Sequence, residues 1–162
     1  MTSFCFGDGT TAACPCGNSG TGGHGCQNSS ATGGALLAVA GSPSLSADTL
    51  SFTASGERPT AFTIFLQGNL EIAPVPFGDG LRCAGGALKR LYSHSASGGI
   101  VSAPQGADLP VSVRSAALGD AIPSGAIRIY QVYYRDPNPT FCPDPPGNTF
   151  NSSNAYRVTW LP

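Results

Sequence analysis

The sequence predicts an all-β protein: an antiparallel β-sandwich or jelly roll of about eight strands with a disulfide-rich N-terminal segment. After residue 34, short apolar stretches rich in β-branched and aromatic residues recur, and Gly, Pro, Ser and Asn separate them. No window of about eleven residues keeps a helical period. The third observation is the set of cysteines, which are Cys5, Cys14, Cys16, Cys26, Cys83 and Cys142.

The chain divides by composition at residue 34. Residues 1–34 are rich in Gly and Cys and nearly free of aliphatic side chains. Cross-links must therefore replace a hydrophobic core there, and we expect this segment to pack on the rest. Residues 35–162 are expected to form the sandwich. The whole chain has 162 residues, the length of one ordinary domain.

Eight strands are expected in the second part. They cover residues 35–40, 49–54, 61–67, 87–93, 99–103, 109–113, 126–134 and 155–160. Two short pieces, 43–47 and 115–118, are expected to form single helical turns. The motif Phe-Gly-Asp-Gly occurs at 6–9 and again at 77–80, and it predicts a recurring turn rather than a duplicated domain.

The clearest strand covers residues 127–134. Alternation places its odd-numbered residues Ile127, Ile129, Gln131 and Tyr133 on one face and its even-numbered residues Arg128, Tyr130, Val132 and Tyr134 on the other. Both faces mix polar and apolar residues. This mixture favours a central strand with one face on the core and the other under a loop or a ligand.

The cysteines indicate an extracellular protein. Their number is even, and the chain is poor in charge, with 10% charged residues and a single lysine, Lys89. We expect Cys83 to pair with Cys142 and the four N-terminal cysteines to form two local bridges. One alternative is a cytosolic protein with free thiols. Another is zinc held by His24 and three of the N-terminal cysteines, although their C-x-C spacing is tighter than in zinc ribbons.

The charge pattern excludes two classes of partner. The net charge is −1 and the arginines are scattered, whereas a nucleic-acid-binding surface needs clustered basic residues. No apolar run approaches the length of a transmembrane helix. Residues 1–3 lack the features of a signal peptide, and we expect a secretion signal or another domain to precede this sequence in nature.

Several motifs of the chain resemble a module that recurs, often C-terminally, in large secreted bacterial proteins of undefined function. The motifs are FCFGDGT, CPCGN and GCQNS near the N-terminus, FGDGLRCAGG in the middle, and YQVYYRDP and VTWLP near the C-terminus. The resemblance covers nearly the whole chain. It implies an extracellular location, and it brings no catalytic residues with it.

The functional hypothesis is a non-catalytic binding module for a carbohydrate or a cell-surface polymer. Its candidate ligand-binding residues are Tyr130, Tyr133, Tyr134, Arg135 and Asp136. Tyrosine rings can lie against sugar faces while polar groups bind the hydroxyls. We expect at least one of the three tyrosines to face outward or lie under a loop.

Calcium is the one cofactor that the sequence suggests. The stretch 136–154 is dense in oxygen donors, and Asp136, Asn138 and Asp144 are the candidate ligands. The spacing matches no EF-hand. The same residues also suit plain turns between prolines.

Two other functions remain open. A structural or self-assembling module would use Gly-rich strands with an unpaired edge. A hydrolase would need a Ser/His site, for which Ser93-His94-Ser95 is a candidate, or a pair of carboxylates. The available carboxylates are Glu57, Glu71, Asp79, Asp108, Asp120 and Asp136. No G-x-S-x-G motif is present, and no catalytic residue is assigned.

Overall fold

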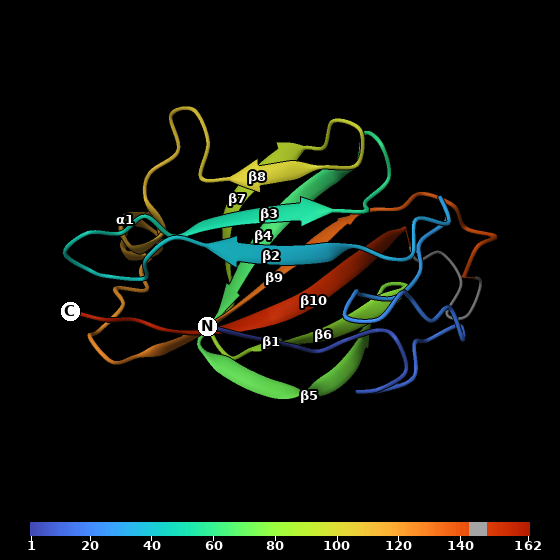
Figure 1. Cartoon of the computed structure of the whole chain (residues 1–162), viewed down its shortest axis with the longest axis horizontal. Helices are drawn as coiled ribbons and strands as arrows, with labels where there is room; N and C mark the ends of the chain where they lie inside the picture. The colour runs from blue at the N-terminus through green and yellow to red at the C-terminus, as the bar shows by residue number, and fades with distance from the viewer. Residues whose placement is uncertain (143–148) are drawn as a thin grey trace.

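The computed structural model describes residues 1–142 and 149–162 and shows two antiparallel sheets packed face to face, with a hairpin beside them (Figure 1). The larger sheet has the strand order β1 (Thr2–Phe4), β10 (Phe150–Thr159), β9 (Ile127–Arg135), β4 (Phe62–Gly68) and β7 (Lys89–Ser95). The smaller sheet has the order β2 (Leu36–Ala40), β3 (Ser51–Ser55) and β8 (Val101–Ala103). The hairpin consists of β5 (Leu70–Phe77) and β6 (Gly80–Gly85). The predicted antiparallel β-sandwich is therefore confirmed.

Strand β9 lies at the centre of the larger sheet, and both of its faces pack against other parts of the chain. Tyr130, Val132 and Tyr134 are buried in the main core between the two sheets. Ile129 belongs to a second core on the opposite face, together with residues of β6 and the N-terminal segment. The alternation predicted from the sequence is correct, and it assigns the two faces to two different cores.

The N-terminal segment and the hairpin are attached to the second face partly by buried polar contacts. The side-chain amide of Gln131 donates to the carbonyl oxygens of Leu81 and Ser153, both at 2.8 Å, and accepts from the amide of Cys83 at 3.1 Å. Gly25 lies so close to β10 that a Cβ there would clash with the carbonyl oxygen of Ser152. This close approach explains one of the glycines in the segment.

All six cysteines form disulfides, with the pairs Cys5–Cys83, Cys14–Cys26 and Cys16–Cys142. The predicted Cys83–Cys142 pair is wrong, and only one of the two predicted local bridges exists. The reason is the course of the N-terminal segment, which contacts both β6 and the loop after β9. Since no thiol remains free, the N-terminal cysteines offer no thiolates to zinc.

Several elements differ from the sequence-based expectation. Strands β1, β5 and β6 were not predicted, and β5 contains Pro74 and Pro76, which normally argue against a strand. The expected strand 109–113 is instead a loop leading into α1 (Val111–Ala117), which also includes part of the expected turn 115–118. Residues 43–47 form bends and one isolated bridge rather than a helical turn.

No helix among the described residues is long and apolar enough to cross a bilayer.

Candidate functional site

Three aromatic rings from three different strands meet at the outer side of the larger sheet. Phe77 ends β5, Tyr133 belongs to β9 and Phe150 begins β10. The ring of Phe77 lies 5.4 Å from that of Tyr133 and 4.9 Å from that of Phe150, and the interplanar angles of 77° and 70° are edge-to-face. All three side chains are only half-buried. Edge-to-face packing fixes each ring against its neighbours while leaving part of it open to solvent.

An arginine accompanies each of these rings. The guanidinium carbon of Arg82 lies 5.3 Å from the centroid of Phe77, and that of Arg90 lies 5.9 Å from the centroid of Tyr133. Arg135 is the cross-strand partner of Phe150. The resulting aromatic–arginine surface consists of Phe77, Tyr133, Phe150, Arg82, Arg90 and Arg135. Burial raises the pKa of the Tyr133 hydroxyl, while Arg90 acts to lower it, so the phenol stays neutral at physiological pH.

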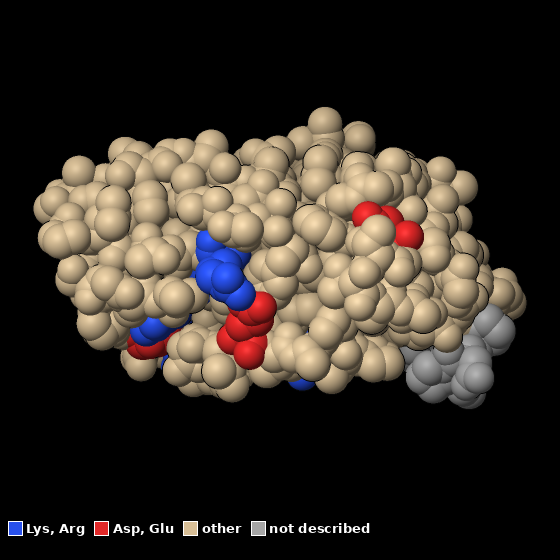
Figure 2. All heavy atoms as spheres, turned by 60° about the horizontal axis from the view of Figure 1, so that its bottom comes forward, with Lys and Arg blue, Asp and Glu red and all other residues tan. Residues whose placement is uncertain are grey.

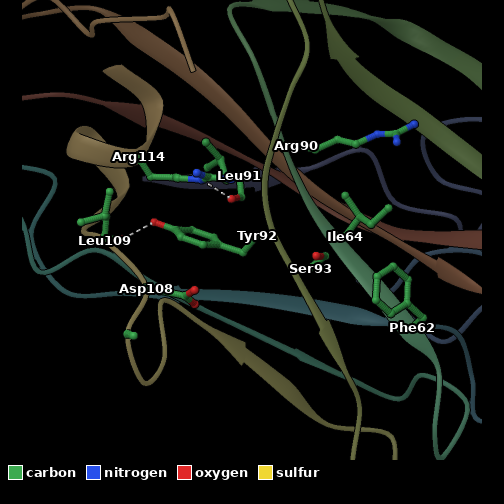
Figure 3. Close-up of a pocket in the computed structure, with 10 residues that line it drawn as sticks. Phe62, Ile64, Arg90, Leu91, Tyr92, Ser93, Asp108, Leu109 and Arg114 are labelled. Atoms are coloured by element: carbon green, nitrogen blue, oxygen red, sulfur yellow. Dashed lines mark hydrogen bonds between the residues drawn. The ribbon is translucent and has the colours of Figure 1, made fainter. Parts of the chain in front are cut away.

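A pocket of about 480 Å³ adjoins this surface along the edge of β4 and β7 (Figure 3). Ile64 links the two features, because its cross-strand partners are Tyr133 on β9 and Ser93 on β7. Partners in direct register point to the same face of a sheet. Phe62, at the start of β4, is 47% exposed and lies at the same end of the pocket as Ile64. The lining also includes Arg90, Leu91, Tyr92, Asp108, Leu109 and Arg114.

Hydrogen bonds fix the other wall of the pocket, which comes from the loop before α1. The Tyr92 hydroxyl donates to the carbonyl oxygen of Leu109 at 2.7 Å. The Asp108 carboxylate accepts from the backbone amide of Gln105 at 2.9 Å and lies 2.7 Å from Nε2 of His94. These bonds set the shape of the wall before any ligand arrives, which limits the entropy lost on binding.

Arg114 closes the edge of β7. Its Nε donates to the carbonyl oxygen of Leu91 at 2.8 Å, so this edge carbonyl is not free for pairing with another strand. His94 contacts a carboxylate, and the described residues include no hydrogen bond between it and a serine. The hydrolase alternative therefore has no Ser–His pair in the described part of the chain.

The three tyrosines proposed from the sequence lie in different environments, two in the core and one at the surface. Tyr130 and Tyr134 are 2% and 0% exposed and belong to the main core, so the prediction that they contact a ligand is wrong. Even-numbered positions of β9 face the smaller sheet, and this is the physical reason. Tyr133 and Arg135 do lie on the aromatic–arginine surface. The expectation that at least one tyrosine of this strand is open to solvent is met by Tyr133.

Asp136 is fully buried, so it does not reach the surface that Arg135 faces. Its carboxylate accepts hydrogen bonds from the backbone amide of Ser29, at 2.9 Å, and from the Ser29 hydroxyl. Nε of Arg58 lies 3.7 Å away. Asp136 therefore ties the N-terminal segment to the end of β9, and its predicted place on an exposed carbohydrate-binding surface is wrong.

The calcium prediction rests on Asp136, Asn138 and Asp144, of which Asp144 lies outside the described residues. The side-chain oxygen of Asn138 accepts from the amide and the hydroxyl of Thr140, at 3.2 and 2.8 Å. Both described ligand candidates thus already have hydrogen-bond donors and do not require a cation. No group of three or more His, Cys, Asp or Glu side chains gathers within the described residues. Calcium binding stays a prediction.

The two Phe-Gly-Asp-Gly motifs form turns with different environments. Asp8 accepts from the hydroxyl and amide of Thr10 and from the amide of Gly23, and these bonds lower its pKa. Asp79 is fully buried, and neither of its carboxylate oxygens has a hydrogen-bond partner among the described residues. Burial, with a further contribution from Asp136, raises the pKa of Asp79 to about 7.

Sequence reasoning missed Phe77, Phe150, Arg82 and Arg90. Phe77 belongs to the repeated motif, but a turn motif does not reveal where its phenylalanine points. The other three residues join the surface through pairings between distant strands. Only the placement of Tyr133 and Arg135 on one face of β9 follows from the alternation of residues along the strand.

The chain matches no family model, no curated protein and no solved structure. A proposal about function must therefore be argued from the chemistry of the aromatic–arginine surface and its pocket.

Proposed function

We propose that this protein is a non-catalytic extracellular module that binds a carbohydrate or a cell-surface polymer on the aromatic–arginine surface and in the adjoining pocket. The observation that carries the proposal is the half-open cluster of Phe77, Tyr133 and Phe150 beside a preformed pocket. Such rings bind the apolar faces of sugars, and the groups around them can bind hydroxyls.

The size and the lining of the pocket suit a few sugar units. Its volume of about 480 Å³ falls in the range of small-molecule sites. Phe62 and Ile64 supply apolar contact, while Ser93 offers a hydroxyl. A longer polymer could continue from the pocket onto Tyr133, because Ile64 connects the two.

The three disulfides support the extracellular part of the proposal. Disulfides persist in oxidising compartments and are rare in the cytosol. They also link the N-terminal segment, which is nearly free of aliphatic side chains, to β6 and to the loop after β9, which suits a module exposed to proteases and changing conditions.

The test is a binding screen with purified protein against a panel of insoluble and soluble polysaccharides. Phe62→Ala and Tyr133→Leu are expected to weaken binding by about tenfold, because each removes an aromatic contact. Ile100→Ala is the matched control, since Ile100 is 54% exposed and lines neither the pocket nor the surface. Size-exclusion chromatography of the same samples separates polymer binding from self-association.

If the wild-type protein binds no member of a broad panel, the proposal is wrong. Equal losses in Ile100→Ala and Phe62→Ala would place the binding site elsewhere. Concentration-dependent assembly without glycan binding would instead favour the structural alternative.

A further inference from the structure

The seven arginines of the described chain fall into two groups according to their partners. Arg58, Arg128 and Arg157 form ion pairs with Asp136, Asp120 and Glu71. On the face shown in Figure 2, the larger groups of basic side chains likewise lie directly against acidic ones. The arginines without a carboxylate partner in the described residues are Arg82, Arg90, Arg114 and Arg135.

These four arginines converge on one region of the molecule. Three of them belong to the aromatic–arginine surface, and Arg114 lines the pocket next to it. The sequence shows arginines scattered along the chain, but the strand order brings them together. Local positive charge therefore gathers on a protein whose net charge is −1.

The described carboxylates do not compensate this charge. Glu57, Asp79 and Asp136 are buried, and Glu71 and Asp120 belong to other ion pairs. Asp8 accepts hydrogen bonds from Thr10 and Gly23, and Asp48 accepts from the amides of Leu50 and Ser112. Asp108 is the one described carboxylate in the pocket lining, and it is engaged by His94 and the Gln105 amide.

The guanidinium groups remain available to a ligand. Arg90 is exposed and its side chain makes no hydrogen bond in the described part of the chain, and its contact there is the ring of Tyr133. Arg82 donates through Nη1 to the carbonyl oxygen of Ala84, and its Nε is buried with no hydrogen-bond partner among the described residues, so this atom is not open to a ligand. Arg135 is exposed, and its Nη1 donates to the Thr149 hydroxyl at 2.9 Å. A guanidinium stacked on a ring keeps its N–H edge free, and this edge matches a carboxylate or a sulfate in a bidentate manner.

We infer that the polymer bound here is an acidic polysaccharide, whose carboxylate or sulfate groups bind Arg90, Arg135 and Arg82 while its sugar rings contact Phe77, Tyr133 and Phe150. This inference rests on the proposed function and narrows its ligand class. Neutral sugars would leave three guanidinium groups beside the rings without a counter-charge. An acidic sugar offers both an apolar ring face and an anion within one residue.

The experiment measures the affinity of the wild-type protein for four soluble polymers by affinity electrophoresis. They are polygalacturonate, dextran sulfate, neutral dextran and single-stranded DNA. We expect at least tenfold tighter binding to one of the two acidic glycans than to neutral dextran or to DNA. We also expect this binding to weaken strongly between about 50 and about 500 mM NaCl, because salt screens exposed charges. The two acidic arms show whether carboxylate or sulfate is the preferred anion.

Two charge-neutralising variants locate the binding. Arg90→Gln and Arg135→Gln are each expected to weaken acidic-glycan binding about tenfold. Arg157→Gln is the control, because it removes the same charge from an exposed arginine that pairs with Glu71 outside the surface. Its expected affinity equals that of the wild type.

Each other outcome has a definite meaning. If only neutral glycans bind, the inference fails while the proposed function stands, and if no glycan of any kind binds, both fail. Equal affinity for single-stranded DNA and for the acidic glycans would show general polyanion binding and overturn the inference. The inference would also be overturned if Arg157→Gln lost as much affinity for the acidic glycans as Arg90→Gln.

Discussion

The side-chain amide of Asn154 forms hydrogen bonds with both backbone groups of Leu37. Its Oδ1 accepts from the Leu37 amide at 2.7 Å, and its Nδ2 donates to the Leu37 carbonyl at 3.2 Å. Asn154 lies where the register of β10 shifts against β9, between Ser152 and Ala155. The Asn154 side chain thus makes the hydrogen bonds that a neighbouring strand would otherwise make to Leu37, and it links the larger sheet to β2 of the smaller one.

We expect Asn154→Ala to lower the free energy of unfolding by about 2 to 3 kcal/mol, because both polar groups of Leu37 would be left buried without a partner. Urea denaturation measures the change. The control is Asn69→Ala, an exposed asparagine between β4 and β5, with an expected cost of about 1 kcal/mol or less. Equal effects of the two substitutions would contradict the role assigned to Asn154.

The single tryptophan allows a second test inside the main core. Nε1 of Trp160 donates to the hydroxyl of Tyr130 at 3.0 Å, and both side chains are almost fully buried. Tyr130→Phe keeps the ring and removes the acceptor, so we expect a loss of about 1 to 2 kcal/mol in the free energy of unfolding. Tryptophan fluorescence during urea denaturation reports this directly. Tyr156→Phe is the control, and an equal loss there would show that the hydrogen bond is not responsible.

The sequence was informative wherever structure depends on near neighbours. Alternation in 127–134 correctly placed Tyr133 opposite to Tyr130 and Tyr134, because strand geometry has a fixed period of two. It did not say which face would meet the larger core. The prolines of β5 hid a real strand, since a two-stranded hairpin at the edge tolerates residues that a central strand does not.

Contacts between distant segments were not predictable in the same way. The cysteine pairs depend on where the N-terminal segment crosses the sheet, and no local pattern encodes this course. Likewise, Arg82 and Arg90 join the same surface only through strand pairing. Tyr133 was a candidate from the sequence, whereas the surface around it needed the structure.

The disulfide connectivity can be checked directly. Digestion without reduction is expected to release peptides that link Cys5 to Cys83 and Cys16 to Cys142, with Cys14 linked to Cys26. Mass spectrometry identifies these linked peptides. A peptide linking Cys83 to Cys142 would contradict the structure.

The lengths of the closed loops predict unequal contributions to stability. Cys5–Cys83 spans 78 residues and Cys14–Cys26 spans 12. In the chain-entropy model, the longer loop contributes roughly 1.5 kcal/mol more. The double variant Cys5→Ser/Cys83→Ser is therefore expected to lose more stability in urea than Cys14→Ser/Cys26→Ser. The reverse order would indicate that strain or packing, rather than loop entropy, dominates.

The last prediction concerns Glu57 and Asp79, two buried carboxylates that both act electrostatically on the hydroxyl of Tyr134. Burial raises the pKa of each to about 7, although the Thr63 hydroxyl donates to Glu57 and acts in the opposite direction. In the unfolded chain both groups titrate near pH 4. Between these values the folded state binds more protons than the unfolded state, so the free energy of unfolding decreases as the pH rises.

We therefore expect the protein to be more stable at about pH 5 than at about pH 8, by on the order of 2 to 3 kcal/mol for each of the two groups. Glu57→Gln and Asp79→Asn should each flatten this dependence, because an amide cannot become charged. Thermal unfolding followed by tryptophan fluorescence across the pH range measures it, with a chelator present so that no bound cation masks the titration. Glu71→Gln, which alters an exposed carboxylate, should keep the slope of the wild type. If stability instead rises between about pH 5 and pH 8, the two buried carboxylates are not protonated in the folded protein, and an unseen positive partner must hold them in the charged form.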